Sequence, residues 1–300
     1  MSMPAFSPEP KSIVPVQPAP APVPARSSTT VRIRPPRRWE ALDLPALWRY
    51  RDLLVALAVR DIKLRYRQTL LGILWVVLQP LIGAGIFAFV FGRVARLDSG
   101  GEPYLLFAYA GLLGWNLFSG IVLKASGTLV ANAALVSKVF FPRLLLPLSG
   151  ALSTLVDFAI GLVAGGILLL ASGRLPGFAL LFAPFWLLML VLMATGLGLV
   201  CAALAVSYRD VLHVLPVALQ FLLYGSPVGY TISVIPPGLP RTLYKLNPLA
   251  PLLEGFRVSL LGRGHIGLLS GSYACCAAVL LFIAGAILFR RRERQFADVI

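Results

Sequence analysis

The sequence is short of charge and of the residue types from which catalytic and metal sites are built. Charged residues make up 13% of its 300 residues and hydrophobic residues 58%, whereas an ordinary soluble domain has about 25% charged residues. Histidine occurs twice, and the twelve acidic residues include no DxD pair of the kind that holds a metal with a nucleotide sugar. Hydrolase triads and zinc sites are therefore unsupported, and we expect no enzyme.

Cysteine and lysine are also scarce. Cys201, Cys275 and Cys276 lie in apolar stretches without CxxC spacing, which argues against a disulfide framework or a structural metal. None of the five lysines follows a glycine, so the chain cannot carry a phosphate-cradling P-loop. We expect no metal and no cofactor in this chain. If its activity is driven by ATP, then the ATP and its Mg²⁺ belong on a partner polypeptide.

The basic residues flank apolar runs. The net charge is +15, yet only 16 of the 39 charged side chains lie in residues 70–289. Charges placed beside apolar stretches are typical of membrane topology signals, not of a nucleic-acid surface. The composition predicts a multi-pass membrane protein that binds no nucleic acid.

Residues before the apolar middle fall into two parts. Residues 1–38 contain ten prolines and lack the pattern of a secretory signal, which predicts a disordered cytoplasmic tail rich in Pro and Ala. Residues 39–69 mix periodic apolar residues with basic ones, and from Leu44 to Gln68 they predict an amphipathic helix at the membrane interface. The alternative is a short soluble helix packed on a partner. Residues 291–300 are expected to form a cytoplasmic C-terminus.

Residues 70–290 predict an all-α transmembrane domain. A membrane-spanning helix needs about 20 mostly apolar residues, and six stretches meet this length. The predicted spans are residues 70–92, 103–130, 144–171, 178–206, 211–234 and 266–289.

The distribution of Lys and Arg predicts the orientation. With the N-terminus inside, the inner flanks of the spans carry eleven basic residues and the outer flanks seven, so both termini are expected inside. The segment 235–264, between spans five and six, is apolar but broken by five prolines. Irregular backbone at membrane depth must be buried in protein or line a wet cavity. We therefore expect a re-entrant or interfacial helix pair on the outer face, with an amphipathic outer loop as the alternative.

Two ionisable residues fall inside predicted spans. Asp157 is mid-span and Lys124 lies nearer a span end. Such groups are costly in the bilayer and are candidates for function. Asp157 either accepts a hydrogen bond from a neighbouring helix or serves transport. Lys124 is expected to extend toward the lipid headgroups more readily than into a pore. So few ionisable groups argue against ion-driven transport.

Aromatic residues are frequent in the first, second and fifth spans. Pro80 follows Gln79 in span one, where it removes a backbone donor and favours a kink. Sugar rings pack their C–H faces on aromatic rings, so an aromatic-lined path would suit a sliding glycan. The alternative is interfacial and lipid-facing packing. The residues assigned to the path are Trp75, Gln79, Phe87, Tyr109, Trp115, Phe118 and Tyr224.

The loop between spans two and three is apolar. Leu135, Val136, Val139 and Phe140 can form one face of a short helix that ends before Pro142. Such a helix can insert into a cleft of a partner, and an ordinary connecting turn is the alternative.

Five strings in order carry a resemblance to a known family. They are RDIKLRYRQTLLGILWVVLQPL (60–81), NAALVSKVFFPRLLLPL (132–148), SYRDV (207–211), SPVGY (226–230) and LNPLAPLLEGFR (246–257). Together they resemble the integral membrane subunits of ABC-2 type polysaccharide exporters, which move O-antigen, capsule or teichoic acid chains. The resemblance covers residues 45–290 and leaves out the proline-rich tail.

The resemblance implies a homodimer of six-span subunits in the bacterial inner membrane, paired with two copies of a cytoplasmic ABC ATPase. Its substrate would be a lipid-linked polysaccharide. The segment 132–142 would be the coupling helix that docks on the ATPase. The residues implied in coupling are Asn132, Leu135, Lys138, Phe140, Phe141, Arg143, Tyr208, Arg209 and Asp210.

The resemblance also implies two substrate-handling sites. The pyrophosphate of the lipid carrier would bind near the basic residues Arg60, Lys63, Arg65 and Arg67, which also suit ordinary membrane lipids. An outer gate would contain Pro227, Tyr230, Asn247, Pro248, Glu254 and Arg257. The chain departs from the family pattern at Lys124, where a small or polar residue is expected, and at Ser207, where Asn is expected.

Two alternatives remain open at this point. The first is an ABC-2 exporter of another substrate, such as a lipid, haem or a drug. The second is a membrane component of glycan assembly that does not transport, either a glycosyltransferase or a scaffold.

Overall fold

Several helices of this protein begin at a proline, and one of them ends at a glycine. The computed structural model describes residues 44–67, 72, 74–174, 177–264, 266–293 and 296, and every regular element among them is helical. Pro103 precedes α4, Pro184 lies in the first turn of α7, and Pro248 precedes α10, positions that a proline tolerates. Gly262 ends α10 with φ of 73°, a left-handed conformation that glycine adopts readily.

The first half of the chain contains the helices α1 (Leu44–Arg49), α2 (Arg51–Tyr66), α3 (Leu74–Phe87), α4 (Tyr104–Ala131), α5 (Ala133–Lys138) and α6 (Leu145–Ala171). A π-helix, η1 (Ala88–Val94), continues α3. The second half contains η2 (Phe178–Phe182), which leads into α7 (Ala183–Ala205), then α8 (Val211–Tyr224), η3 (Ile232–Val234), α9 (Leu239–Leu246), α10 (Leu249–Leu261) and α11 (Leu268–Glu293).

Within the described residues, five helices are long and apolar enough to cross a membrane. They cover residues 74–94, 104–131, 145–171, 178–205 and 268–293, so five of the six predicted spans agree with the structure to within a few residues. The sixth, predicted over 211–234, is wrong in its length. Its helix α8 has 14 residues and ends at Tyr224, because Gly225, Pro227 and Gly229 break the helical backbone that follows.

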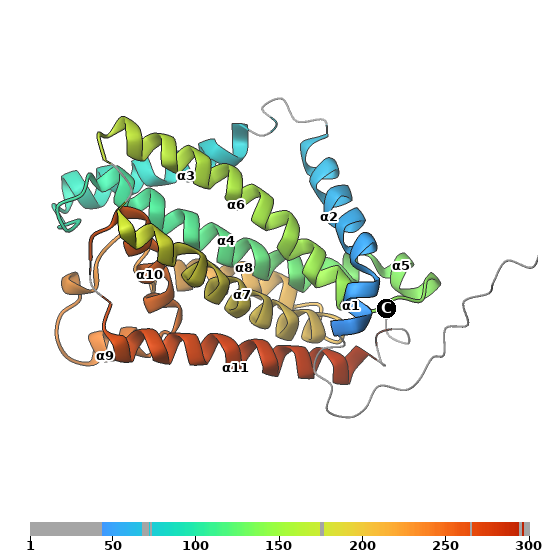
Figure 1. Ribbon diagram of the computed structural model, residues 1–300. Coiled ribbons are helices and arrows are strands. Elements are labelled where there is room, and N and C mark those ends of the chain that lie inside the picture. The colour runs from blue at the N-terminus through green and yellow to red at the C-terminus, as the bar shows by residue number, and fades with distance from the viewer. Residues whose placement is uncertain are drawn as a thin grey trace, which may run out of the picture. The chain divides into compact units, whose positions relative to one another are not determined.

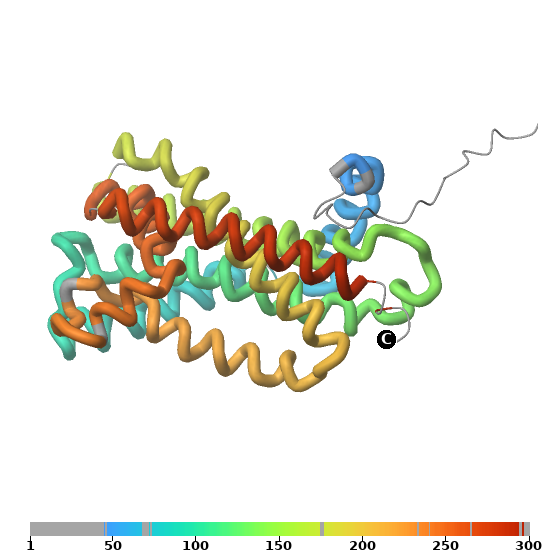
Figure 2. Tube along the Cα trace, turned by 90° about the horizontal axis from the view of Figure 1, so that it is seen from below, coloured from blue at the N-terminus to red at the C-terminus, as the bar shows by residue number. Residues whose placement is uncertain are grey.

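Helix α4 lies at the centre of the bundle and contacts α3, α6, α7, α8 and α10 (Figures 1 and 2). Its core residues include Phe118 and Ile121, which pack with Leu190 of α7 and Phe256 of α10. We call the end of the bundle that carries α5 the α5 end, and the opposite end, with α9 and α10, the α9 end (Figure 1).

Helices α7 and α11 make the most extensive helix pair in the fold, and they lie side by side in Figures 1 and 2. A Cβ atom built on Gly285 would lie 2.3 Å from the carbonyl oxygen of Gly196. Only glycine at both positions lets the two backbones approach this closely, which is a common device where helices pack in membranes.

Helix α2 lies across α6 in Figure 1, and the two helices are in contact. The predicted helix over 44–68 therefore exists, as α1 and α2, its place at the membrane interface stays a prediction, and its exposed side is not uniformly polar. Val55, Val59 and Leu64 are exposed together with Arg51 and Lys63, so apolar and charged side chains are mixed around α2. Leu57 is buried in a second core cluster at the α5 end.

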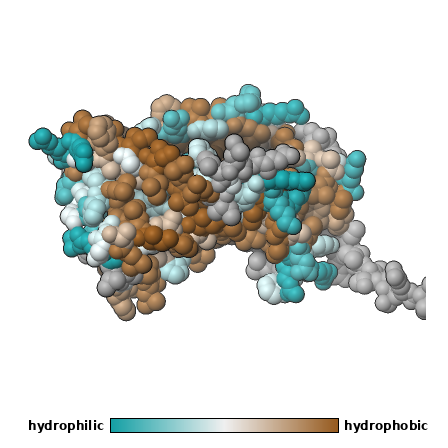
Figure 3. Space-filling view, turned by 90° about the horizontal axis from the view of Figure 1, so that it is seen from above, coloured by the Kyte–Doolittle hydropathy of each residue, from teal (hydrophilic) through white to brown (hydrophobic). Residues whose placement is uncertain are grey.

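The surface of the bundle is strongly apolar. Figure 3 shows apolar side chains across the middle of one face and hydrophilic side chains toward its two ends. Large exposed apolar residues on the long helices include Ile86, Val163, Ile167 and Leu280, as a lipid-facing surface requires. The proline-rich tail of residues 1–38 and most of the predicted C-terminal segment after Glu293 lie outside the described residues.

Candidate functional site

A cavity lies between α3, α4 and α6, next to the end of α2, and we call it the α3–α4–α6 cavity. Its volume is about 810 Å³, which is within the range of ligand-binding sites. Trp75 and Gln79, both assigned to the glycan path from the sequence, line it. Its other polar lining residues are Arg65, Tyr66, Asn116, Ser119, Lys124, Thr154 and Asp157.

A cluster of charges forms one wall of this cavity. Asp157 of α6 accepts a hydrogen bond from the Tyr66 hydroxyl at 2.6 Å and an ion pair from Lys124 Nζ at 3.3 Å. The guanidinium of Arg65 also pairs with Asp157. Burial, followed by the hydrogen bond to Asp157, raises the pKa of Tyr66 to about 12. One carboxylate on α6 therefore holds the C-terminal turn of α2 and the middle of α4.

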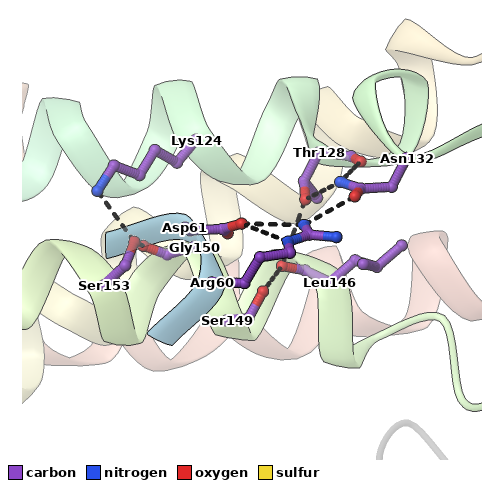
Figure 4. A network of polar contacts seen from close by, with 9 residues as sticks. All are labelled: Arg60, Asp61, Lys124, Thr128, Asn132, Leu146, Ser149, Gly150 and Ser153. Atoms are coloured by element: carbon purple, nitrogen blue, oxygen red, sulfur yellow. Dashed lines mark hydrogen bonds and ion pairs between the residues drawn. The ribbon is translucent and has the colours of Figure 1, made fainter. Parts of the chain in front are cut away.

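The sequence favoured a Lys124 side chain that extends toward the lipid headgroups. In the structure the side chain points into the bundle instead. Its ammonium donates to Ser153 Oγ at 3.0 Å on α6 (Figure 4) and lies in the cavity wall. The nearby acceptors Ser153 and Asp157 offset the cost of keeping this charge inside the bundle, so the side chain turns inward.

A second polar network joins α2 to the junction of α4 and α5. Arg60 Nη2 donates to Asn132 Oδ1 at 2.8 Å and pairs with Asp61 Oδ1 at 2.9 Å (Figure 4). Asn132 in turn donates from Nδ2 to the Thr128 carbonyl at 2.8 Å. Because Asn132 ends α4 and precedes α5, a displacement of α5 would act on Arg60 directly.

The four basic residues assigned to pyrophosphate binding thus divide into two pairs. Arg60 and Arg65 are held by intramolecular partners. Lys63 and Arg67 are exposed, which leaves their charges facing the surroundings of α2.

The predicted helix between spans two and three is α5, and it is shorter than expected. Val136 is buried, whereas Val139 and Phe140 follow the helix end, with Phe140 74% exposed. The four apolar residues therefore do not form a single helical face. Phe141 is buried at 5% exposure, and the backbone N–H of Arg143 donates to Glu293 Oε1 of α11 at 3.2 Å.

The second group assigned to coupling lies at the same end of the bundle, in the turn between α7 and α8 (Figure 1). Tyr208, Arg209 and Asp210 are all exposed. The α5 end therefore presents two exposed loops, one carrying Phe140 and the other Tyr208.

The other aromatic residues assigned to the path do not line the α3–α4–α6 cavity. Trp115 and Phe118 are buried in the α4 core at 5% and 2% exposure. Tyr109 donates its hydroxyl to the Gly161 carbonyl at 2.8 Å. Phe87 packs on Phe91 with ring centroids 5.4 Å apart. Tyr224, at the end of α8, is exposed.

The residues assigned to the outer gate do come together, at the α9 end. Arg257 of α10 is 2% exposed and donates to the Pro227 carbonyl at 2.9 Å. It also pairs with Glu254 and lies over the ring of Phe107, 3.8 Å from the centroid. A buried arginine thus ties the irregular segment after α8 to α10 and α4.

Asn247 holds the same segment from α9. Its Nδ2 donates to the Gly225 carbonyl at 3.2 Å and to Ser226 Oγ at 2.9 Å, and its Oδ1 accepts from the N–H of Leu249 at 3.0 Å. The Tyr230 hydroxyl donates to the Tyr224 carbonyl at 2.5 Å. Together these bonds satisfy backbone groups that the break in the helix leaves without helical partners.

The sequence reasoning missed two features. Glu102 is buried and pairs with Arg174 at 3.6 Å and with Arg263 at 3.0 Å, which joins three loops far apart in the sequence. Asn116 and Ser119 of α4 line the α3–α4–α6 cavity. Their spacing of three residues on one helical face was the available signal.

Comparison with known proteins places these features in context. A family profile described as "ABC-2 type transporter" matches residues 52–261. The O-antigen export system permease protein RfbA of Myxococcus xanthus is 29% identical over 255 residues, covering 85% of this chain and 97% of that relative. RfbA of Klebsiella pneumoniae is 26% identical, covering 83% and 95%. The polysialic acid transport protein KpsM of Escherichia coli is 27% identical, covering 79% and 92%.

Proposed function

This chain belongs to the ABC-2 type transporter family, and we propose that it is the channel-forming membrane subunit of an ATP-driven exporter of lipid-linked polysaccharide. The observation that carries the proposal is the near full-length similarity to permeases named for O-antigen export and polysialic acid transport. The apolar bundle, with five helices able to span a membrane, supports a multi-pass location in the inner membrane.

The finer proposal is a homodimer with both termini inside and two copies of a cytoplasmic ABC ATPase, which would bind the ATP and Mg²⁺. The exposed loops at the α5 end support a docking role for this end. Phe140 and Tyr208 are large side chains at 74% and 64% exposure, and aromatic residues of this kind often anchor interfaces.

The proposed mechanism follows the contacts of α5. Movement of the ATPase would displace α5, and the hydrogen bond from Arg60 to Asn132 would pass that displacement to α2. The exposed Lys63 and Arg67 would attract the pyrophosphate of the lipid carrier, since Arg60 and Arg65 already have partners. Segment 235–264 is proposed as the re-entrant outer gate, and its residues Asn247 and Arg257 hold it to Ser226 and Pro227.

The test is ATP hydrolysis by the reconstituted complex of this chain and its ATPase, with and without a lipid-linked glycan. We expect the glycan to stimulate hydrolysis. Stimulation by a lipid, haem or a drug, and not by glycans, would show a different cargo. A chain that forms no complex with an ABC ATPase would be a non-transporting component.

Phe140→Ala tests the docking surface, and Phe178→Ala is its matched control. Both phenylalanines are strongly exposed, at 74% and 81%. Phe140 follows α5, whereas Phe178 begins η2, which packs on α10 at the α9 end. Phe140→Ala should weaken ATPase binding by roughly tenfold or more, as the loss of an interface anchor does, and Phe178→Ala should not. Equal effects of the two substitutions would refute docking at the α5 end.

A further inference from the structure

The α3–α4–α6 cavity opens on the outside of the bundle. Two of its lining residues, Trp75 and Leu123, are 52% and 39% exposed. The surface around it is apolar and faces lipid in a membrane protein of this kind. A molecule reaching this cavity would therefore come from the bilayer.

The charge of the cavity wall is unbalanced. Lys124 and Arg65 share the single carboxylate of Asp157, which leaves one positive charge, while nearby Arg60 and Asp61 neutralise each other. Asp157 and Lys124 have only 14% and 25% of their side chains exposed, whereas Arg65 has 49%. An unbalanced charge in such surroundings is costly, so the wall favours one added negative charge.

The same side chains have hydrogen-bond donors to spare. An ammonium has three N–H donors and a guanidinium five. Lys124 donates to Ser153 and Asp157, which leaves one donor, and Arg65 has several beyond its bond to Asp157. Phosphate oxygens are the acceptors that such cations bind most strongly.

A second, apolar cavity lies further along the same helices. Its volume is about 270 Å³, and Leu106, Leu162, Leu169 and Leu170 are among its lining residues from α4 and α6. Leu113 lines both cavities. Lys124 and Leu113 are eleven residues apart on one helix, hence separated by about 16 Å, which is close to the roughly 15 Å thickness of one hydrocarbon leaflet.

We infer that the seam between α4 and α6 binds an anionic membrane phospholipid with one phosphodiester and one net negative charge. The phosphate lies against Lys124 and Arg65 in the first cavity, and an acyl chain follows α4 to the second. A pyrophosphate carrier lipid fits less well, because its two negative charges would leave one charge unbalanced beside Asp157. This site is separate from the exposed Lys63 and Arg67 proposed for the transported lipid.

Native mass spectrometry of the purified full-length chain tests the site. The probes are dioleoylphosphatidylglycerol, which has one net negative charge, and zwitterionic dioleoylphosphatidylcholine. We expect the anionic lipid to bind at least tenfold more tightly. Lys124→Gln should weaken its binding about tenfold, whereas Lys245→Gln, at an exposed lysine of α9, should leave it unchanged. Equal loss in both variants, or no preference between the lipids, would overturn the site.

Asp157→Asn gives a result that a merely structural role would not produce. Removing the carboxylate raises the positive charge of the wall, so the variant should bind phosphatidylglycerol more tightly, by about tenfold, and unchanged or weaker binding would count against the site. Arg65→Gln, at a half-exposed side chain, should weaken binding without loss of folding, as judged by thermal stability.

A polyprenyl pyrophosphate is the competing probe. It should bind the wild-type chain more weakly than phosphatidylglycerol and should gain affinity in Asp157→Asn. Preference of the wild-type chain for the pyrophosphate would assign the cavity to the transported lipid and overturn the inference. Because these measurements need neither the ATPase nor transport, their failure is distinguishable from failure of the proposed function.

Discussion

Arg257 is the side chain whose removal should have the largest effect on the α9 end. It is 2% exposed and joins Glu254, the Pro227 carbonyl and the ring of Phe107. Its loss would leave a partly buried carboxylate and a backbone carbonyl without their partner. Breaking a buried ion pair in this way costs about 3–5 kcal/mol.

The assay is thermal unfolding of the purified chain in detergent. Arg257→Leu should lower the melting temperature by roughly 6–20 °C, given about 2–4 °C per kcal/mol for chains of this size. Arg93→Leu, at an exposed arginine, is the control and should have little effect. Arg257→Lys should fall between the two, because lysine keeps the charge but not the planar fork of donors.

A double variant separates charge from packing. Arg257→Leu combined with Glu254→Gln removes both charges, so it should recover part of the stability that Arg257→Leu loses. A melting temperature of Arg257→Leu equal to that of the Arg93→Leu control would refute the reasoning, because it would mean that the buried arginine holds nothing together.

Three further substitutions follow from the geometry. Gly196→Ala would place a Cβ 2.6 Å from the Phe282 backbone nitrogen and should destabilise the chain by about 1–3 kcal/mol. Gly166→Ala is the control and should not destabilise it, because nothing lies within 4 Å of the added Cβ. Thermal unfolding measures both variants. Arg60→Gln should reduce glycan-stimulated ATP hydrolysis more than ATPase binding, and equal losses would contradict its role in coupling. The stabilising contribution of Tyr66 should be fully present below pH 10.0 and should be lost as the pH rises through its raised pKa of about 12. Melting temperatures measured against pH should therefore fall less steeply in this range for Tyr66→Phe than for the wild-type chain.

The long helices could be predicted from the sequence because their signal is local. A run of about 20 apolar residues ended by a charge, proline or glycine is enough to place a span. The same reasoning failed for α8, since the apolar residues continue to Val234 and obscured the break at Gly225 and Pro227. Here the turn residues decided the structure, not the hydropathy.

The candidate site was predictable only in part, because its contacts are not local. Asp157 and Arg65 are 92 positions apart, and no periodicity reports such a pair. The outer cluster was found because a resemblance to a family brought Pro227, Asn247 and Arg257 together. The burial of Trp115 and Phe118 was not predicted. The sequence of a membrane helix does not distinguish aromatic residues that face the protein core from those that face lipid or a substrate path.

The brevity of α8 bears on how the protein is made. A helix of 14 residues is about 21 Å long, which is well short of the roughly 30 Å of hydrocarbon it would have to cross alone, and it contains Pro216. It is apolar, but it cannot span the hydrocarbon layer by itself as it leaves the ribosome. Helix α4, which is synthesised earlier and contacts α8 in the finished fold, supplies the surface against which α8 settles. We therefore expect stable insertion of α8 to depend on its contact with α4.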